Sequence, residues 1–532
     1  MSDGPYIRLK EPKPINRRER IRLLGWINVA LCVLLISIGV LLMGALIPRA
    51  WYHHRFRPYP PNSCIEPFSS CPLVLISMDG FRHDYVELVR SRYGQTALPN
   101  FHRLQSGGVR GMRAIGTYPT LTMPNHESLI TGLNTESHGV VGDDFQDVKF
   151  PNDAFQMNNQ TSLNKSPWLE AWPEPIWVTL HHAGRMVGTI LWPLTDAPVR
   201  SVLPFVQVSQ FALFNDPRSR YPYEKRVSDM LWWLDNLRYS LDLILAYFDE
   251  PNRAGHMYGP RSDEVAQRVI ELDNVVGQLL SGLEARGLHN RVNIIFISTH
   301  GMTEVKGVID LDKHVKPSWY THTQLSTVGF IYPKSGRFAE VYHGLQQSKE
   351  HMKVYRSDDV PPDLCFSRNS SRMPPIVVIP DQGWCLVNNN KTHCDAGEHG
   401  YPVNVSDMHG FFYAWGPSFL SNATAEQVHA IDVYPLIAGL LGIQPRPNNG
   451  SLERIARAIL KSDVAERLIT TPTWFPRWWA WFMGQLSMAW LSVGFILWVV
   501  LFALLLTSIY VQGRYIRVAA IPDPGRWSEE KN

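Results

Sequence analysis

The chain has 532 residues, of which 45% are hydrophobic and 19% charged, and its formal net charge is +3 at pH 7. This composition excludes a disordered protein, and the length allows one large globular domain or two ordinary ones. The net charge is small, and no long run of Lys and Arg is interleaved with aromatic residues. Both features argue against nucleic acid as a partner.

The first predicted element is a membrane-spanning helix over residues 23–47, which carry no charge and are rich in Leu, Ile and Val. About 20 apolar residues are enough for a helix to cross the hydrocarbon core. A cleaved signal peptide is the alternative, but the run is longer than a signal h-region, and no clean small-x-small cleavage site follows it. We therefore expect an uncleaved anchor after a cytoplasmic tail of residues 1–22.

The next predicted unit is an α/β domain over residues 49–470. Apolar runs of strand length recur between helical stretches, at residues 73–78, 243–248, 292–298 and 411–414. Such continuous runs are typical of strands buried on both faces, so we expect a mostly parallel central sheet flanked by helices. Residues 334–407 are rich in Pro, Asn, Ser and Cys and interrupt this pattern. They predict an insertion or cap rather than a separate domain.

A second spanning helix is predicted over residues 486–511, again without charge, after a Trp-rich stretch that suits a membrane interface. The positive-inside rule fixes the orientation. Four arginines precede the first span and two follow the second, namely Arg17, Arg18, Arg20, Arg22, Arg514 and Arg517. This places both tails, residues 1–22 and 512–532, in the cytoplasm and the domain in the lumen of the secretory pathway or at the cell surface.

Glycosylation acceptors and cysteines agree with that topology. Seven Asn-x-Ser/Thr motifs all lie between the spans, at Asn159, Asn164, Asn369, Asn390, Asn404, Asn422 and Asn449. Five cysteines lie there too, at Cys64, Cys71, Cys365, Cys385 and Cys394, and Cys32 lies in the first span. Because five is odd, at least one of the five is free or paired with another chain.

Candidate metal ligands follow the predicted strands, where ligands collect in α/β sheets. Asp79 comes directly after the first run, His256 comes a few residues after the second, and His300 follows the third. His399 precedes the last run. Each residue alone is more commonly a helix cap or a turn residue. Together, one Asp and three His predict a metal cluster.

A candidate nucleophile lies in the string Thr122-Met-Pro-Asn-His126. Pro124 and Gly132 frame a short helix whose N-terminus lies next to Thr122. A hydroxyl at the positive end of a helix, beside a metal, can be ionised into a nucleophile. On this segment alone, an N-cap role for Thr122 is the favoured interpretation.

Nine short strings of the chain, which begin with Met78–Arg82 and end with Gly416–Phe419, are similar in order and spacing to the signatures of one family. This is the nucleotide pyrophosphatase/phosphodiesterase family, and the similarity extends over about 350 residues. The resemblance implies the fold of the alkaline phosphatase superfamily, and the chain length suits the short, membrane-anchored members. The matching strings are Met78–Arg82, Thr122–His126, Thr131–Leu133, Glu136–Gly139, Glu174–Trp177, Gly255–Pro260, His300–Met302, His399–Tyr401 and Gly416–Phe419.

The resemblance implies a two-zinc site in which a threonine attacks the phosphorus of a phosphodiester. The resulting phospho-threonine is then released by water. Thr122 matches the nucleophile. Asp79, Thr122 and His300 match the ligands of one metal, and His256 and His399 match ligands of the other.

Three departures from the family pattern affect the expected chemistry. Asn252 and Thr299 stand where the family carries Asp ligands, and Asp143 or its neighbour Asp144 stands where an Asn steadies the phosphoryl oxygen. Neutral ligands offset less of the charge of two divalent cations, so zinc is expected to bind weakly or to be absent. An Asp beside the phosphoryl group adds repulsion. The alternative is that Asp143 or Asp249 has become a replacement ligand.

Two functions therefore remain open from the sequence. The favoured one is a weakly active or non-catalytic member that binds a phosphate-bearing nucleotide or lipid, or that scaffolds a membrane-protein partner through its spans. The alternative is an active metal-dependent phosphodiesterase or pyrophosphatase of nucleotides or choline-type lipids, acting through a phospho-threonine.

Overall fold

The computed structural model of the chain forms two compact units, Pro58–Trp474 and a unit of the two terminal stretches Met1–Arg57 and Phe475–Asn532. The first unit overlaps the predicted domain 49–470. The structure describes residues 26–27, 71–150, 153–164, 168, 173–210, 221–236, 239, 241–348, 351–367, 371–470, 501, 503–508 and 510.

The two predicted membrane spans, residues 23–47 and 486–511, lie outside the described residues except for a few positions. Among the helices that are described, none combines the length and the apolar character that crossing a bilayer requires. The spans and the two cytoplasmic tails therefore stay predictions.

The central sheet has the strand order β18-β2-β17-β8-β1-β7-β5-β6, and β19 also pairs with β2. The four predicted strands are present. The predicted strands are β1 (Leu73–Met78), β7 (Leu243–Phe248), β8 (Asn293–Ile297) and β17 (Gly410–Trp415). The others are β2 (Val109–Ile115), β5 (Val187–Ile190), β6 (Val206–Val208), β18 (Ala423–Ala425) and β19 (Val428–His429).

The prediction of a mostly parallel sheet is confirmed with one correction. β1 runs parallel to both β7 and β8, and β5 runs parallel to β7. β17, however, runs antiparallel to both β8 and β2. A continuous apolar run predicts burial on both faces, but it carries no information on strand direction.

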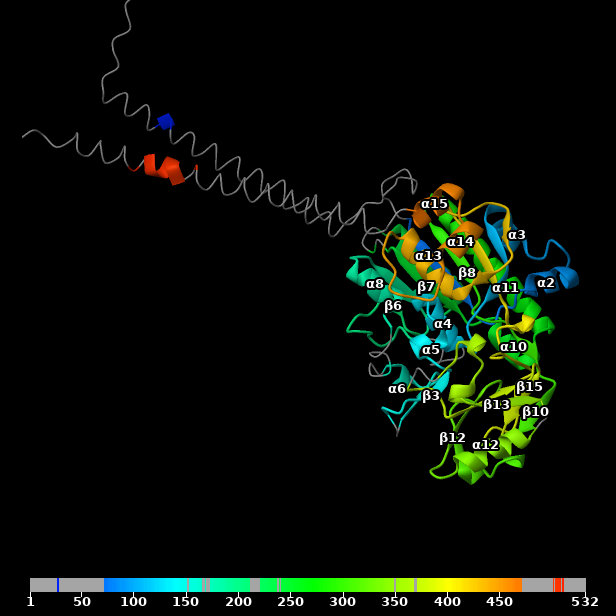
Figure 1. The fold of residues 1–532 in the computed structure, drawn as a ribbon. Coiled ribbons are helices and arrows are strands. Elements are labelled where there is room, and N and C mark those ends of the chain that lie inside the picture. The colour runs from blue at the N-terminus through cyan, green and yellow to red at the C-terminus, as the bar shows by residue number, and fades with distance from the viewer. Residues whose placement is uncertain are drawn as a thin grey trace, which may run out of the picture. The chain divides into compact units, whose positions relative to one another are not determined.

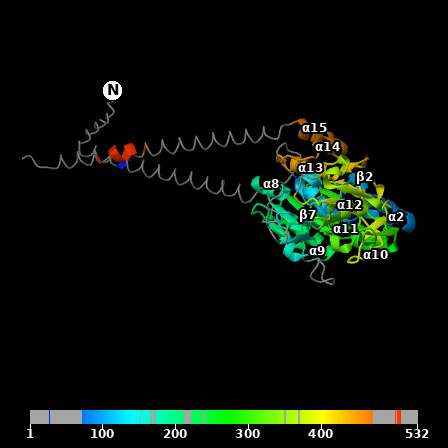
Figure 2. The ribbon, with the colours of Figure 1, turned by 60° about the horizontal axis from the view of Figure 1, so that its bottom comes forward.

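Helices cover both faces of the sheet (Figures 1 and 2). Along β1, Leu73 and Leu75 belong to one apolar core, whereas Val74 and Ile76 belong to the other, as alternation along a strand requires. The first core includes residues of α4 (Thr122–Thr131), α8 (Ile176–His182), α13 (Val433–Leu440) and α14 (Leu452–Ile459). The second includes residues of α2 (Tyr85–Tyr93), α3 (Pro99–Gly107), α9 (Tyr223–Asp235) and α11 (Asp263–Ala285).

The insertion that follows β8 is larger than the sequence predicts, and it has an apolar core of its own. It begins near Gly307 rather than at residue 334, and it remains part of the Pro58–Trp474 unit. Its sheet has the order β11-β12-β14-β13, beside a β10-β15 pair (Figure 1). The elements are β10 (Gly307–Asp310), β11 (Tyr320–His322), β12 (Gly329–Pro333), α12 (Phe338–Gln347), β13 (Met352–Arg356), β14 (Ile376–Pro380) and β15 (Trp384–Val387).

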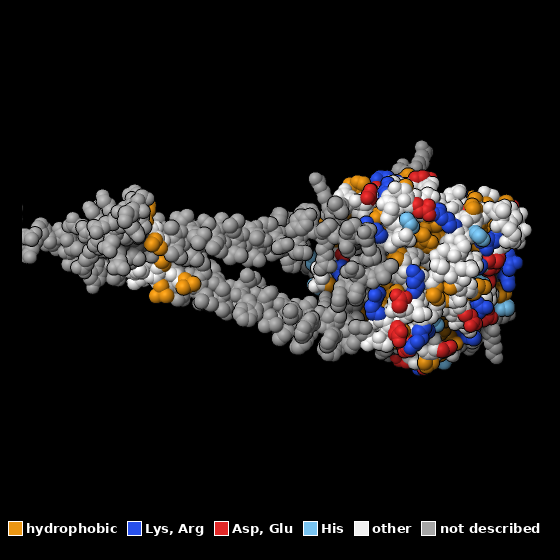
Figure 3. Space-filling model, turned by 90° about the horizontal axis from the view of Figure 1, so that it is seen from above, with side chains coloured by type: hydrophobic (Ala, Val, Ile, Leu, Met, Phe, Trp, Pro, Cys, Tyr) orange, Lys and Arg blue, Asp and Glu red, His pale blue; other side chains and the backbone are white. Residues whose placement is uncertain are grey.

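Charged side chains of both signs are mixed on the molecular face drawn in Figure 3. No broad patch of one sign covers that face, which agrees with the net charge of +3. A surface of this kind offers no extended track for a phosphate backbone.

The helix α4, which begins at Thr122, is buried along its whole length and ends at Gly132 in the left-handed conformation. In its middle, Glu127 is fully buried, and neither of its carboxyl oxygens has a hydrogen-bond partner in the part of the chain that the structure describes. Burial raises the pKa of Glu127 from an ordinary 4.5 to about 8. The folded protein therefore holds this carboxyl protonated at neutral pH.

We predict that Glu127→Gln stabilises the protein at neutral pH. The raised pKa means that the stability contributed by neutral Glu127 is fully present below pH 4.5 and is lost as the pH rises toward 8. At pH 7 the cost is about 3 kcal/mol, since each pKa unit corresponds to ~1.4 kcal/mol. Thermal unfolding between pH 4 and 8 should show a gain for Glu127→Gln that shrinks toward pH 4.

The control is Glu453→Gln on α14, which removes an exposed carboxyl instead of a buried one and should not reproduce the gain of Glu127→Gln. Parallel pH profiles for wild type and Glu127→Gln would contradict the prediction.

Candidate active site

The predicted site residues lie beyond the carboxyl ends of the central strands or on the segments packed there. Asp79 follows β1 and His300 follows β8. His256 lies on α10 (Asn252–Tyr258) after β7, and Thr122 is the first residue of α4. His399 follows β16 (Gly397–Glu398). Parallel strands bring these segments to one edge of the sheet.

The Asp79 carboxylate is the centre of the cluster. It lies 3.2 Å from the Thr122 hydroxyl and 3.0 Å from His300 Nε2. It also accepts hydrogen bonds from the Tyr247 hydroxyl at 2.8 Å and the Thr299 hydroxyl at 3.3 Å. Burial opposes the ionisation of Asp79, but the charge and hydrogen bond of His300 outweigh it and hold the pKa of Asp79 well below its usual range.

The two remaining histidines extend the cluster outward. The ring of His399 stacks on that of His300, with centroids 3.6 Å apart, and the ring of His256 lies 5.0 Å from that of His399. Burial, and then repulsion by His300, hold the pKa of His399 well below its ordinary value. The structure therefore brings Asp79, Thr122, His256, His300 and His399 into one cluster.

His300 and His399 each direct Nδ1 toward a backbone carbonyl. His300 Nδ1 lies 2.9 Å from the Gly301 carbonyl, and His399 Nδ1 lies 2.9 Å from the Thr120 carbonyl. A carbonyl only accepts, so each Nδ1 carries a proton, and a metal would bind each ring at Nε2 in its neutral form. This arrangement is usual for metal-bound histidines, whose second ring nitrogen donates to a backbone carbonyl.

The spacing of the inner donors also fits a metal. Thr122 Oγ1, His300 Nε2 and the Asp79 oxygens lie 3.0 to 3.3 Å apart. Two ligands of a tetrahedral zinc, with bonds near 2.0 Å, are separated by about 3.3 Å. Asp79, Thr122 and His300 thus form a donor set whose chemistry and spacing fit one zinc ion.

The two replaced positions are neutral groups within this cluster. The Asn252 backbone N–H donates to the Asp79 carbonyl at 3.0 Å, while the buried Asn252 Oδ1 finds no hydrogen-bond partner within the described ranges. The Thr299 hydroxyl donates a hydrogen bond to Asp79, but it does not supply the negative charge of the Asp that the family carries at this position. Gly80, at φ +64°, allows this close packing, since a Cβ there would lie 2.7 Å from the Asn252 Cα.

Asp143, rather than Asp144, lies beside the nucleophile. Asp143 Oδ1 accepts from the Met123 backbone N–H at 2.8 Å, so it occupies a donor in the first turn of α4. Asp144 instead accepts from the Met157 backbone N–H, within the β3–β4 hairpin (Asp144–Gln146 and Ala154–Gln156). Burial raises the pKa of Asp143 to about 7.

The N-cap interpretation of Thr122 is wrong. Leu121 holds the N-cap position of α4, and Thr122 is already helical, so its hydroxyl is directed to Asp79 and His300.

The two alternative replacement ligands also have other partners. Asp249 pairs with Arg226 at 3.1 Å and with Arg253 at 3.8 Å, and Asp143 binds the α4 terminus.

Sequence reasoning missed three side chains that contact the cluster. Tyr247 lies within the apolar run of β7, yet its hydroxyl donates a hydrogen bond to Asp79. Asp395 and Glu398 lie 3.4 and 3.8 Å from His256 Nδ1. A signal was present for Glu398, which directly precedes His399 in the sequence, but no signal linked Asp395 to His256.

Comparisons with known proteins agree with this architecture. Residues 73–402 match the family described as type I phosphodiesterase / nucleotide pyrophosphatase. Human ectonucleotide pyrophosphatase/phosphodiesterase family member 5 is 34% identical over 381 residues, covering 71% of this chain and 76% of that protein. Human bis(5'-adenosyl)-triphosphatase ENPP4 is 35% identical over 391 residues, covering 72% and 81%.

Solved structures of murine and human ENPP5 superpose on this chain with a TM-score of 0.67 at 31% and 32% identity, and each covers 73% of it. An inactive murine ENPP5 variant, with one threonine replaced by alanine, is among the similar structures, in complex with AMP. The central sheet thus has the alkaline-phosphatase-like α/β fold. On the family match and these relatives, the chain belongs to the type I phosphodiesterase / nucleotide pyrophosphatase family.

Proposed function

We propose that this chain is a membrane-anchored ectodomain that binds a phosphate-bearing nucleotide at Thr122 and hydrolyses phosphodiesters slowly or not at all. One observation carries the proposal. Asp79 contacts Thr122 and His300, but the two further positions at which the family carries Asp are the neutral Asn252 and Thr299.

The charge of the site explains the expected weakness. Two divalent cations need several anionic oxygens to offset their charge and the loss of their hydration. Asp79 must also share its two oxygens among the hydroxyls of Thr122, Tyr247 and Thr299. Each of these donors competes with a cation for the same lone pairs. We therefore expect zinc to be held more weakly than in a site with three carboxylates.

The chain's own residues position a nucleophile for attack on phosphorus. Asp79 and His300 hold the Thr122 hydroxyl at the start of α4, where the helix dipole favours an anion. Bound zinc would ionise the Thr122 hydroxyl and withdraw charge from the phosphoryl oxygens. Asp143 works against this step, because its carboxyl takes the Met123 N–H and faces the phosphoryl position with an acid instead of an amide.

A nucleotide is the favoured ligand because the names of two relatives mention nucleotides. ENPP4 is named as a bis(5'-adenosyl)-triphosphatase, and a murine ENPP5 variant is described in complex with AMP. The second candidate function is an active phosphodiesterase or pyrophosphatase. The contacts among Thr122, Asp79 and His300 favour it, since the nucleophile and its immediate partners are in place.

We also infer a luminal or extracellular location for the domain. The exposure of the glycosylation acceptors and the presence of disulfides support this inference. Six of the seven acceptor asparagines are described and all six are exposed, while Asn369 lies outside the described residues. Cys385 and Cys394 form a disulfide, Cys71 is also disulfide-bonded, and Cys365 is free. Disulfides persist in oxidising compartments.

The function is tested by restoring the acids. Asn252→Asp combined with Thr299→Asp should raise zinc affinity by roughly ten- to a hundred-fold, the scale of effects around metal ligands. The purified full-length protein should hold zinc weakly and cleave bis(4-nitrophenyl) phosphate slowly, and the double variant should hold zinc more tightly. Elemental analysis and the hydrolysis assay check both. A zinc-replete, rapidly hydrolysing wild type would establish the active alternative instead.

Asp143 is tested by the pH dependence of ligand binding. The Asp143 carboxyl is neutral below its raised pKa of about 7 and anionic above it, so binding of a phosphodiester anion should weaken as the pH rises through 7. Asp143→Asn should abolish this slope and tighten binding at pH 8 by about tenfold, the equivalent of one pKa unit. Calorimetry with bis(4-nitrophenyl) phosphate in a Thr122→Ala background measures it. An equal effect of Asp144→Asn would contradict a specific role for Asp143.

The topology is tested by glycosidase treatment of the full-length protein from cells. Several glycans at the exposed acceptors should be removed, with a matching shift in mobility, and tags at Met1 and Asn532 should be inaccessible on intact cells. An unglycosylated chain, or a tag that antibodies reach from outside, would exclude this topology.

A further inference from the structure

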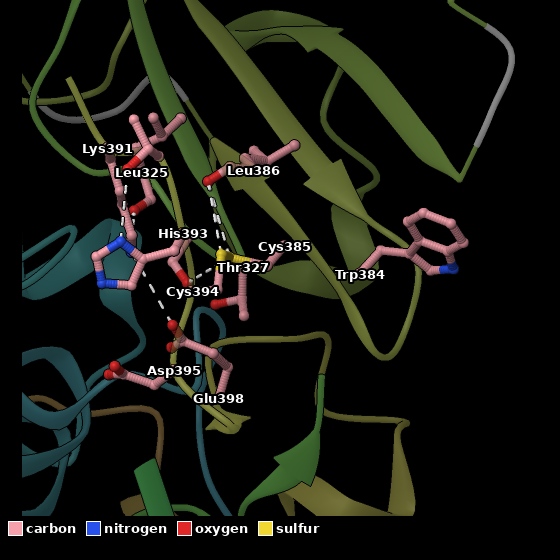
Figure 4. The surroundings of a disulfide bond; sticks show 12 residues. Leu325, Thr327, Trp384, Cys385, Leu386, Lys391, His393, Cys394, Asp395 and Glu398 are labelled. Atoms are coloured by element: carbon pink, nitrogen blue, oxygen red, sulfur yellow. Dashed lines mark hydrogen bonds and ion pairs between the residues drawn. A yellow bond between two sulfur atoms is a disulfide. The ribbon is translucent and has the colours of Figure 1, made fainter. Parts of the chain in front are cut away.

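A second group of ligand-type side chains lies at the outer side of the histidine cluster. His256 on α10 faces Asp395 and Glu398 on the loop that leads to His399. One ligand atom from each of the three lies within 4.8 Å of the other two. His256 Nδ1 is 3.4 Å from Asp395 Oδ2 and 3.8 Å from Glu398 Oε2. Figure 4 shows the two carboxylates on the same stretch of loop, beside the Cys385–Cys394 disulfide.

The three groups lie at ion-pair distances from one another, so without a metal a protonated His256 would pair with the two carboxylates. His256 Nδ1 is buried and has no hydrogen-bond partner among the described residues. Lys391 Nζ forms a long ion pair with Glu398 Oε1 at 3.9 Å, too far for a hydrogen bond. Glu398 is only 6% exposed, so its charge is costly unless a cation compensates it. Two carboxylates and an imidazole gathered in this way are the ligand types of a divalent transition metal.

The backbone fixes this arrangement firmly. The Cys385–Cys394 disulfide attaches the residue before Asp395 to β15. The Ala396 N–H donates to the His256 carbonyl at 2.9 Å, which holds the loop against α10. Gly397 allows this approach, because a Cβ there would lie 2.4 Å from the Gly255 carbonyl oxygen. Glu398 is also held in β16, which pairs with β9 (Thr303–Glu304).

We propose that His256, Asp395 and Glu398 hold a divalent cation of the zinc class, with the two carboxylates supplying the charge that Asn252 does not. The inference rests on the proposed function, because it concerns the outer half of the same site. Asn252 and His256 are four residues apart on α10 and share one face of that helix. A cation that lies nearer to Asp395 and Glu398 than to Asn252 would therefore still lie next to His256.

The experiment measures zinc binding to the full-length protein, stripped with a chelator and titrated with Zn²⁺ by calorimetry and elemental analysis. Asp395→Asn combined with Glu398→Gln should remove one zinc equivalent or weaken it by at least about tenfold. Adding Asn252→Asp to that double variant should recover binding, because it returns a carboxylate to the same face of α10.

The control is Asp381→Asn, which alters another Asp–His pair of the insertion, with His351, and should leave zinc binding unchanged. Thermal unfolding of the chelator-treated proteins shows whether each variant is folded. A zinc-induced rise in melting temperature, present in wild type and reduced in the folded double variant, is the second readout.

Two results would overturn the inference. One is a wild type that binds no zinc, and the other is a folded double variant that binds zinc as tightly as wild type while His256→Ala does not. The second result would mean that the carboxylates only orient His256. Binding of bis(4-nitrophenyl) phosphate to the same preparations separates this failure from failure of the proposed function. A wild type that does not bind the diester would refute the proposed function. Zinc binding that is unchanged in the folded double variant would refute only the outer cation site.

Discussion

The contact of the buried Asp79 carboxylate with Thr122 and His300 is the interaction on which the site depends. An ionised carboxylate in the interior is costly unless charged and hydrogen-bonded partners surround it. Strands β1, β7 and β8 run parallel, so their carboxyl ends deliver those partners to one point. The same geometry lets segments between residues 79 and 399 form a single cluster.

The site differs from the family pattern in where its negative charge lies. At the inner positions, Thr299 donates a hydrogen bond to Asp79 where an acid is expected, and Asn252 offers an amide. Acids are found instead at Asp143, which accepts a hydrogen bond from the first turn of α4, and at Glu398, beside His256. The first of these opposes phosphate, and the second favours a cation. The chain thus keeps the nucleophile position, whereas the positions at which the family carries acidic metal ligands are changed.

The insertion after β8 contributes residues to this cluster. It has its own apolar core, and its last loop carries Asp395, Glu398 and His399 back to α10 and the central sheet. A disulfide and a short β pairing hold that loop. The outer half of the site is therefore held by a covalent link and by backbone hydrogen bonds, which favour a defined ligand geometry.

The sequence by itself determined the α/β class, the four apolar strands and the identity of the residues at their ends, because burial on both faces leaves continuous apolar runs. It could not determine the direction of β17, since a run of apolar residues reads alike in both directions. Nor could it distinguish Asp143 from Asp144, because neighbouring side chains on an extended chain point to opposite sides. The approach of Asp395 and Glu398 to His256 was decided only by tertiary packing, since it depends on how closely one loop and one helix, far apart in the chain, come together.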